Sequence, residues 1–127
     1  MIQEFEKNYK LSWAITILIA GLIFYFSTFS FSRNISELGY VSNWKSIVYH
    51  IFIFFSLSLF LLISFVRGRK DYRLFLFSFF VLVAYGILDE IHQFFVPGRF
   101  CSLIDLGFDS LGILFAFMIY LIYLKLK

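Results

Sequence analysis

The sequence is poor in the residues that interrupt or cross-link a chain, because its 127 residues include one cysteine, one proline and seven glycines. A lone cysteine, Cys101, cannot form an intrachain disulfide, so the sequence gives no indication of the redox compartment. No low-complexity tract, internal repeat or linker divides the chain, and we predict a single domain over residues 1–127. Charged residues make up only 15%, and a net charge of +3 gives no indication of nucleic-acid binding.

Apolar residues dominate the composition. Hydrophobic residues make up 61% of the chain and aromatic residues 24%, and the mean hydropathy is +0.89. A water-soluble domain of this length could not bury that much apolar surface. Four apolar segments, each long enough to cross a hydrocarbon core of about 30 Å as a helix, span Leu11–Phe31, Ile47–Val66, Leu74–Val96 and Ile104–Leu124. Their connections are short, so we predict an all-α membrane protein whose four transmembrane helices form an up-down antiparallel bundle.

Local signals refine these helices. The first apolar segment is expected to remain in the protein, because it is longer than the apolar region of a signal peptide and no small-residue cleavage site follows it. Ser102 is expected to cap the fourth helix, with Asp105 at the third position of a capping box. The small residues Gly21 and Gly86 would allow neighbouring helices to approach closely.

Basic residues are divided unevenly between the two sides of the predicted bundle. Eight of the eleven lie on the side of the chain termini and the second connection: Lys7, Lys10, Arg67, Arg69, Lys70, Arg73, Lys125 and Lys127. The other three are Arg33, Lys45 and Arg99. The positive-inside rule therefore predicts cytoplasmic termini in a multi-pass protein of the cell membrane. We interpret the run from Arg67 to Arg73 as a topology determinant, and a specific contact with anionic lipid is the alternative.

Polar residues recur at one depth in all four predicted helices. Counted from a cytoplasmic basic residue, Ser27, His50, Asp89 and Asp109 each lie 16 or 17 residues away, which is about 24–26 Å of helix. This level falls in the outer part of the membrane. Charges beside hydrocarbon are costly, so a polar cluster within a membrane span is by default a hypothesis for a functional site.

Helical spacing places the polar residues on stripes that can converge on one pocket. The stripes are Asp89 with His92, Glu90 with Gln93, Asp105 with Asp109 and Gly112, and Ser46 with His50. With Glu37, the carboxylates of this outer region outnumber its three basic residues. Protonation, a bound cation or water must therefore offset the excess negative charge.

The cluster also has a purely structural interpretation. Asp89 and Arg99 could form an ion pair that closes the bundle, and Asp105 could serve only as a helix cap. His50 could be a hydrogen-bonded interior residue, and Lys45 an interfacial side chain that snorkels. We favour a ligand site, because two histidines, four carboxylates and an arginine exceed what bundle closure requires. No tight ligand motif is present, so we name no metal ligand and leave the cofactor open, although a divalent cation is chemically possible between Asp89, His92, Asp105 and Asp109.

The same residues resemble the VanZ-like family of small integral membrane proteins. The family motif is Asp-Glu-x-His-Gln, Pro-Gly-Arg and Ser-x-x-Asp-x-x-x-(Asn or Asp)-x-x-Gly; it is matched here by Asp89, Glu90, His92, Gln93, Pro97, Gly98, Arg99, Ser102, Asp105, Asp109 and Gly112. The first helix ends on Phe24-Tyr25-Phe26-Ser27, which is similar to the family's aromatic-aromatic-x-Ser. The second helix departs from the family pattern, because His50 is followed by Ile51 and not by phenylalanine. The resemblance implies an outer-envelope setting: the founding member is linked to teicoplanin resistance, and others to cell-surface or antimicrobial-peptide responses.

These residues together predict a site that binds or modifies an anionic envelope lipid or lipid-linked precursor near the outer leaflet. Arg99, helped by Lys45, would hold a phosphate or carboxylate. The candidates for acid–base catalysis are Glu90, His92 and Asp89. The candidates for substrate binding are Arg99, Gln93, Asp105, Asp109, His50, Lys45 and Ser27.

The rival hypothesis is a non-catalytic membrane interaction or scaffold module that alters the access of glycopeptides or peptides to the cell surface. It stays open because Ser102 and Cys101 have no evident partner that would make either one a nucleophile. Transport of protons or cations is disfavoured, since the stretch Leu111–Leu124 carries no charged residue that could continue a conduction path. Membrane lipids are the one class of partner predicted, and the oligomeric state is left open.

Overall fold

The computed structural model describes residues 1–29, 44–98 and 102–127, and within these ranges every regular element is a helix. A short helix α1 (Ile2–Lys7) precedes four long ones: α2 (Tyr9–Ser27), α3 (Trp44–Val66), α4 (Tyr72–Phe94) and α5 (Leu103–Leu126). Each long helix has the length and composition needed to cross a membrane. The prediction of an all-α membrane protein with four spanning helices is thereby confirmed.

The helix ends differ from the predicted ones by a few residues. The first long helix was expected to reach Phe31, but α2 ends at Ser27. The Thr28 hydroxyl bonds back to the Tyr25 carbonyl, as hydroxyl side chains commonly do where they compete with backbone hydrogen bonding. The apolar segment of the sequence continues beyond Ser27, so its end did not predict the end of α2. Likewise α4 ends at Phe94, two residues before the predicted limit.

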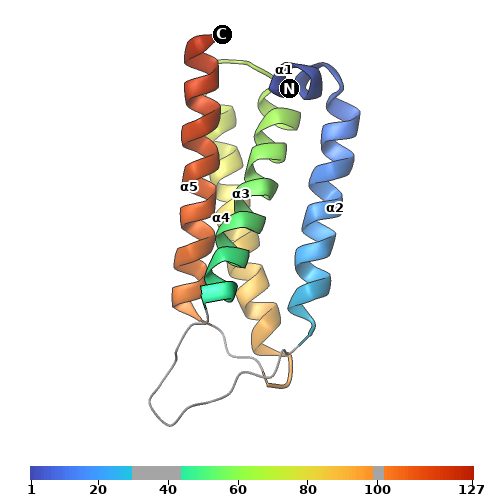
Figure 1. The fold of residues 1–127 in the computed structure, drawn as a ribbon, viewed down its shortest axis with the longest axis vertical. Coiled ribbons are helices and arrows are strands. Elements are labelled where there is room, and N and C mark those ends of the chain that lie inside the picture. The colour runs from blue at the N-terminus through green and yellow to red at the C-terminus, as the bar shows by residue number, and fades with distance from the viewer. Residues whose placement is uncertain (30–43, 99–101) are drawn as a thin grey trace.

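The four long helices lie side by side, with α3 packed most extensively against α5 and α2 (Figure 1). Both chain termini lie at one end of the bundle, which we call the terminal end (Figure 1). One apolar core includes Ile23, Phe54, Leu57, Leu82 and Ile113. A second lies nearer the terminal end and comprises Leu62, Ile63, Val66, Tyr120 and Leu124. Most other large apolar side chains are exposed on the outside of the bundle, as expected where lipid is the solvent.

Helices α3 and α5 are in close backbone contact at Gly112. A Cβ atom at this position would collide with the Ile51 carbonyl oxygen and lie 2.9 Å from the Phe55 nitrogen, so only glycine permits this backbone contact. At Gly86 a Cβ would meet side chains at 3.3 Å or more. The close approach expected at Gly21 is not present among the described residues, because nothing lies within 4 Å of its added Cβ.

A hydrogen-bonded clasp joins the two ends of the chain at the terminal end. Glu6 of α1 accepts hydrogen bonds from the hydroxyl groups of Tyr120 and Tyr123, at 2.7 and 2.9 Å, and from Lys127 Nζ at 2.8 Å. The Tyr120 hydroxyl also accepts one from the backbone of Gly68 at 2.9 Å. Burial alone would raise the pKa of Glu6, but the three donors outweigh it and hold the pKa below its ordinary value. Neither α1 nor this clasp was predicted from the sequence.

Candidate functional site

Buried polar side chains from all four long helices gather at the end of the bundle opposite the chain termini. We call them the polar layer: Ser27 of α2, His50 of α3, Asp89, Glu90 and Gln93 of α4, and Asp105 and Asp109 of α5. None of them is more than 5% exposed. The helix limits explain their common level, because Ser27 is the last residue of α2 and Asp105 lies in the first turn of α5.

One part of the polar layer links α2 to α4. The Ser27 hydroxyl donates a hydrogen bond of 2.5 Å to Asp89 Oδ1. The side-chain amide of Gln93, one turn further along α4, donates to Asp89 Oδ2 at 2.8 Å. Both oxygens of the Asp89 carboxylate therefore have a donor, which offsets part of the cost of burying it.

A second part links α3 to α5. His50 Nδ1 lies 2.8 Å from Asp109 Oδ1, and the two side chains are 5% and 1% exposed. An ionised carboxylate only accepts hydrogen bonds, so the proton of this bond is on His50 Nδ1 when Asp109 is charged. The other oxygen, Asp109 Oδ2, is buried without a hydrogen-bond partner among the described residues.

Glu90 connects the polar layer to the start of α5. The backbone N–H of Ser102 donates to Glu90 Oε2 at 2.6 Å. The Ser102 hydroxyl accepts from the Asp105 nitrogen at 3.2 Å, so the predicted N-cap is confirmed. Glu90 Oε1 is buried and has no hydrogen-bond partner within the described ranges.

Three side chains of the polar layer also converge on one point. His50, Glu90 and Asp109 each present a ligand atom, and these atoms lie within 4.8 Å of one another. They come from α3, α4 and α5, which the apolar core below them holds together. This set differs from the one considered on sequence grounds, which included Asp89 and His92.

The remaining predicted site residues are placed less centrally or fall outside the description. His92 stacks on the Phe24 ring with the ring centroids 4.2 Å apart. Its Nε2 atom is buried without a partner in the described part of the chain. Lys45 is exposed at the start of α3. Arg99, predicted to bind phosphate or carboxylate, lies outside the described residues, as does Cys101.

Residues 12–124 match the family described as VanZ/LLP1, which is nearly the whole chain. The chain belongs to this family. The family predicted from the Asp-Glu-x-His-Gln motif is thereby confirmed. Comparisons with curated proteins and with solved structures gave no match. Membership in the VanZ/LLP1 family does not by itself fix a substrate or a reaction, so function must be argued from the site.

In this VanZ/LLP1 member an apolar groove reaches the polar layer from the side, between α2 and α4. Its volume is about 290 Å³, and it is lined by Phe24, Tyr85, Leu88 and Asp89. The Tyr85 hydroxyl donates to the Ala20 carbonyl at 2.6 Å, which fixes one wall of the groove. Phe24 and Leu88 were not predicted from the sequence as site residues. Their positions relative to predicted site residues could have indicated them, because Phe24 precedes Ser27 by three residues and Leu88 adjoins Asp89.

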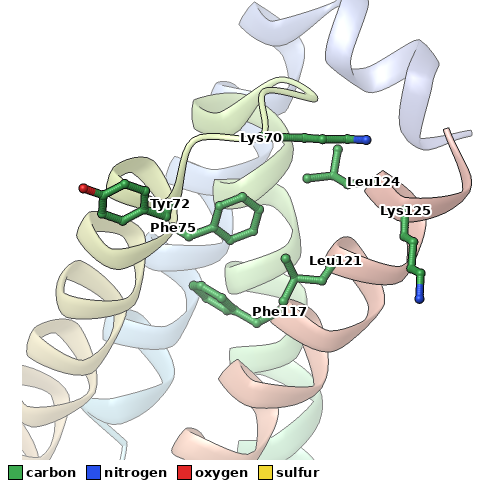
Figure 2. A pocket seen from close by; sticks show the side chains of 7 residues that line it. All are labelled: Lys70, Tyr72, Phe75, Phe117, Leu121, Leu124 and Lys125. Atoms are coloured by element: carbon green, nitrogen blue, oxygen red, sulfur yellow. The ribbon is translucent and has the colours of Figure 1, made fainter.

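A larger groove lies at the terminal end, far from the polar layer. Its volume is about 520 Å³, and it is lined by Lys70, Tyr72, Phe75, Phe117, Leu121, Leu124 and Lys125. Figure 2 shows the lysine side chains beside a wall of aromatic and leucine side chains. It contains no carboxylate or imidazole among its lining residues, so we do not place acid–base chemistry there.

Proposed function

We propose that this VanZ/LLP1 member binds the headgroup of an anionic cell-envelope lipid, or of a lipid-linked envelope precursor, at the polar layer. The observation that carries the proposal is the apolar groove that ends at the Asp89 carboxylate. A groove of this kind suits an amphiphile, because its walls can hold a hydrocarbon chain while the polar layer receives the headgroup. The burial of so many polar groups in one layer supports a functional role, since closure of an apolar bundle does not require it.

In this proposal the helices cross the cell membrane as an up-down antiparallel bundle with both termini cytoplasmic. The excess of basic residues at the termini and the second connection supports that orientation. The two termini also lie at the same end of the bundle (Figure 1). The polar layer would then sit beneath the headgroups of the outer leaflet, where a lipid can enter sideways between α2 and α4.

The charge of the polar layer limits how an anionic headgroup can bind. The layer contains four carboxylates and one imidazole, so a phosphate needs positive charge beside it. Two basic residues are near in sequence: Lys45 precedes His50 by five residues, and Arg99 follows Glu90 by nine. We assign them the binding of phosphate or carboxylate oxygens, for which a guanidinium is especially suited.

Chemical modification of the bound lipid is a second candidate function, and the bond between His50 and Asp109 favours it. A carboxylate bonded to one imidazole nitrogen orients the ring so that the other nitrogen can accept or donate a proton. This geometry favours His50 for the role that the sequence analysis gave to His92, which stacks on Phe24. Glu90 remains an acid–base candidate, because it lies beside this pair.

Lipids that co-purify with the chain test the binding proposal. We expect mass spectrometry of the purified chain to show one phosphate-bearing lipid class enriched over the host membrane. Leu88→Trp should reduce the enrichment by filling the groove. Ile87→Trp is the matched control, because Ile87 is the preceding residue on α4, is 42% exposed and does not line the groove. A lipid profile equal to the bulk membrane would contradict the proposal.

Conversion of the enriched lipid distinguishes catalysis from a scaffold. If the site is catalytic, the His50→Gln protein that remains folded in detergent should retain the lipid and not convert it, whereas a non-catalytic module shows no conversion even in the wild type. Teicoplanin susceptibility of cells with and without the chain then tests whether the lipid lies on the route to a glycopeptide target. Unchanged susceptibility would remove that part of the proposal and leave lipid binding to be judged by mass spectrometry.

A further inference from the structure

Three buried side chains from three helices form a cluster, and two of its carboxylate oxygens accept no hydrogen bond from the described residues. His50, Glu90 and Asp109 are 4%, 3% and 0% exposed. Within the described ranges, Glu90 Oε1 and Asp109 Oδ2 are buried and accept no hydrogen bond. An unpaired carboxylate oxygen in a dry interior is costly, so each such atom requires an explanation.

The distances within this group suit a shared cation as well as a hydrogen bond. The separation of 2.8 Å between His50 Nδ1 and Asp109 Oδ1 is near the spacing of about 3 Å between adjacent ligands of an octahedral cation bound at about 2.1 Å. The ligand atoms of all three residues lie within 4.8 Å of one another. A small inward movement of the side chains would place one ion in contact with all of them, and the ion would replace the proton of His50 Nδ1, which is released to solvent.

We propose that His50, Glu90 and Asp109 bind a divalent first-row transition cation, of which Zn²⁺ and Mn²⁺ are the representatives. An imidazole with two carboxylates favours these ions over Mg²⁺ and Ca²⁺, which prefer oxygen ligands alone. The ion offsets the negative charge of the two buried carboxylates and provides a partner for oxygens that lack a hydrogen bond. Three protein ligands also leave a coordination position for an outside oxygen.

The cation site stands apart from the lipid-binding proposal, because it rests only on the contacts of these three residues. If both hold, the open position offers a contact to a phosphate oxygen and reduces the repulsion between an anionic headgroup and the carboxylates. Titration with metal alone, in detergent, tests the cation site, so failure to bind metal would leave the lipid experiment unaffected.

Metal titration of the intact chain tests the proposal. The chain is purified in detergent, stripped with a chelator and titrated with ZnCl₂ or MnCl₂, and bound metal is measured by elemental mass spectrometry. We expect a single saturable equivalent per chain and a higher unfolding temperature in its presence, since a ligand that binds only the folded state stabilises it. If neither Zn²⁺ nor Mn²⁺ binds saturably, the proposal is overturned.

Substitution of the ligands locates the ion. Glu90→Gln and Asp109→Asn should each weaken binding by about tenfold or more, since loss of a ligand costs at least as much as loss of its supporting groups. Asp89→Asn is the matched control. Asp89 is also a buried carboxylate and precedes Glu90, but both of its own oxygens already accept hydrogen bonds, from Ser27 and Gln93. Binding that survives both ligand substitutions, or that Asp89→Asn weakens equally, would overturn the assignment.

A spectroscopic measurement on the wild-type chain covers the case in which a ligand variant does not fold. Pulsed electron paramagnetic resonance of the Mn²⁺-loaded chain should show coupling to one imidazole nitrogen. The coupling should persist in His92→Gln, because His92 stacks on Phe24 and is not part of the group. Absence of nitrogen coupling in the wild type, or its loss in His92→Gln, would refute the site.

Discussion

The backbone N–H of Ser102 donates a hydrogen bond of 2.6 Å to Glu90 Oε2. In a capping box this N–H would be accepted by an acidic side chain three residues later in the same helix, here Asp105. In this chain the acceptor comes from α4, while the Ser102 hydroxyl still caps the Asp105 nitrogen. The start of α5 is therefore held both by its own cap and by the neighbouring helix.

Removal of the cap should destabilise the bundle modestly. Ser102→Ala deletes the hydroxyl acceptor but keeps the N–H that bonds to Glu90, so we expect a loss of about 1 kcal/mol in the free energy of unfolding. Unfolding in detergent with increasing denaturant measures it. Ser110→Ala is the control, because the Ser110 hydroxyl bonds to Leu106 within α5 and should matter by less than about 0.5 kcal/mol. Equal losses in the two variants would contradict the capping role.

The buried pair of His50 and Asp109 should behave as a unit. With one partner replaced, the other stays buried without its bond, and such changes cost about 3–5 kcal/mol. We expect His50→Gln and Asp109→Asn each to destabilise the chelated, metal-free chain strongly. The double variant should lose less than the two single losses combined, by a coupling energy of about 0.5–3 kcal/mol. Strict additivity in a double-mutant cycle would show that the 2.8 Å contact contributes nothing.

The close contact at Gly112 predicts opposite effects for two glycines of the same helix. Gly112→Ala forces a Cβ against the Ile51 carbonyl and the Phe55 nitrogen, and overpacking of this kind costs about 1–3 kcal/mol. Gly107→Ala meets nothing within 4 Å and should stabilise α5 by about 0.5–1 kcal/mol through its higher helix propensity. Thermal unfolding of both variants measures the difference. A Gly112→Ala variant as stable as the wild type would show that α3 and α5 do not touch there.

The clasp around Glu6 predicts a specific dependence of stability on pH. Because the folded-state pKa of Glu6 lies below the ordinary value of 4.5, the clasp stabilises the fold above that pH. This contribution is lost as the pH falls through the folded-state pKa. Wild type should therefore unfold at a higher temperature than Glu6→Gln at pH 7, and the gap should narrow as the pH is lowered toward 3.

A second glutamate in α1 provides the control for this pH dependence. Glu4 is 76% exposed and lies 3.8 Å from Lys7, so Glu4→Gln should unfold like the wild type throughout the titration. A gap between wild type and Glu6→Gln that stays constant from pH 7 to pH 3 would show that ionisation of Glu6 is not the cause. The groups facing Glu6 are Tyr120, Tyr123 and Lys127, and we expect only the lysine to be charged in this range.

Many residues of the candidate site could be predicted from the sequence, but their hydrogen-bond partners could not. Helical spacing and depth correctly named Ser27, Asp89 and Asp109 as members of one level, because rise per residue converts sequence distance into depth. The partners could not be inferred in the same way. Glu90 was assigned an acid–base role with no partner, whereas the structure bonds it to the backbone of Ser102. Because every residue except proline has a backbone N–H, the pattern of residue types does not indicate which N–H will donate to a given side chain.

The amino-acid sequence by itself determined the membrane class, the four spanning helices and the family, because hydrophobic length and a local motif express themselves within one segment. Tertiary structure alone decided which polar groups meet: Asp109 with His50, Glu90 with Ser102, and Glu6 with the end of α5. Those contacts depend on how each helix rotates about its axis and how closely α3 and α5 approach at Gly112. Rotation and spacing are set by packing between segments far apart in sequence, which no single segment encodes.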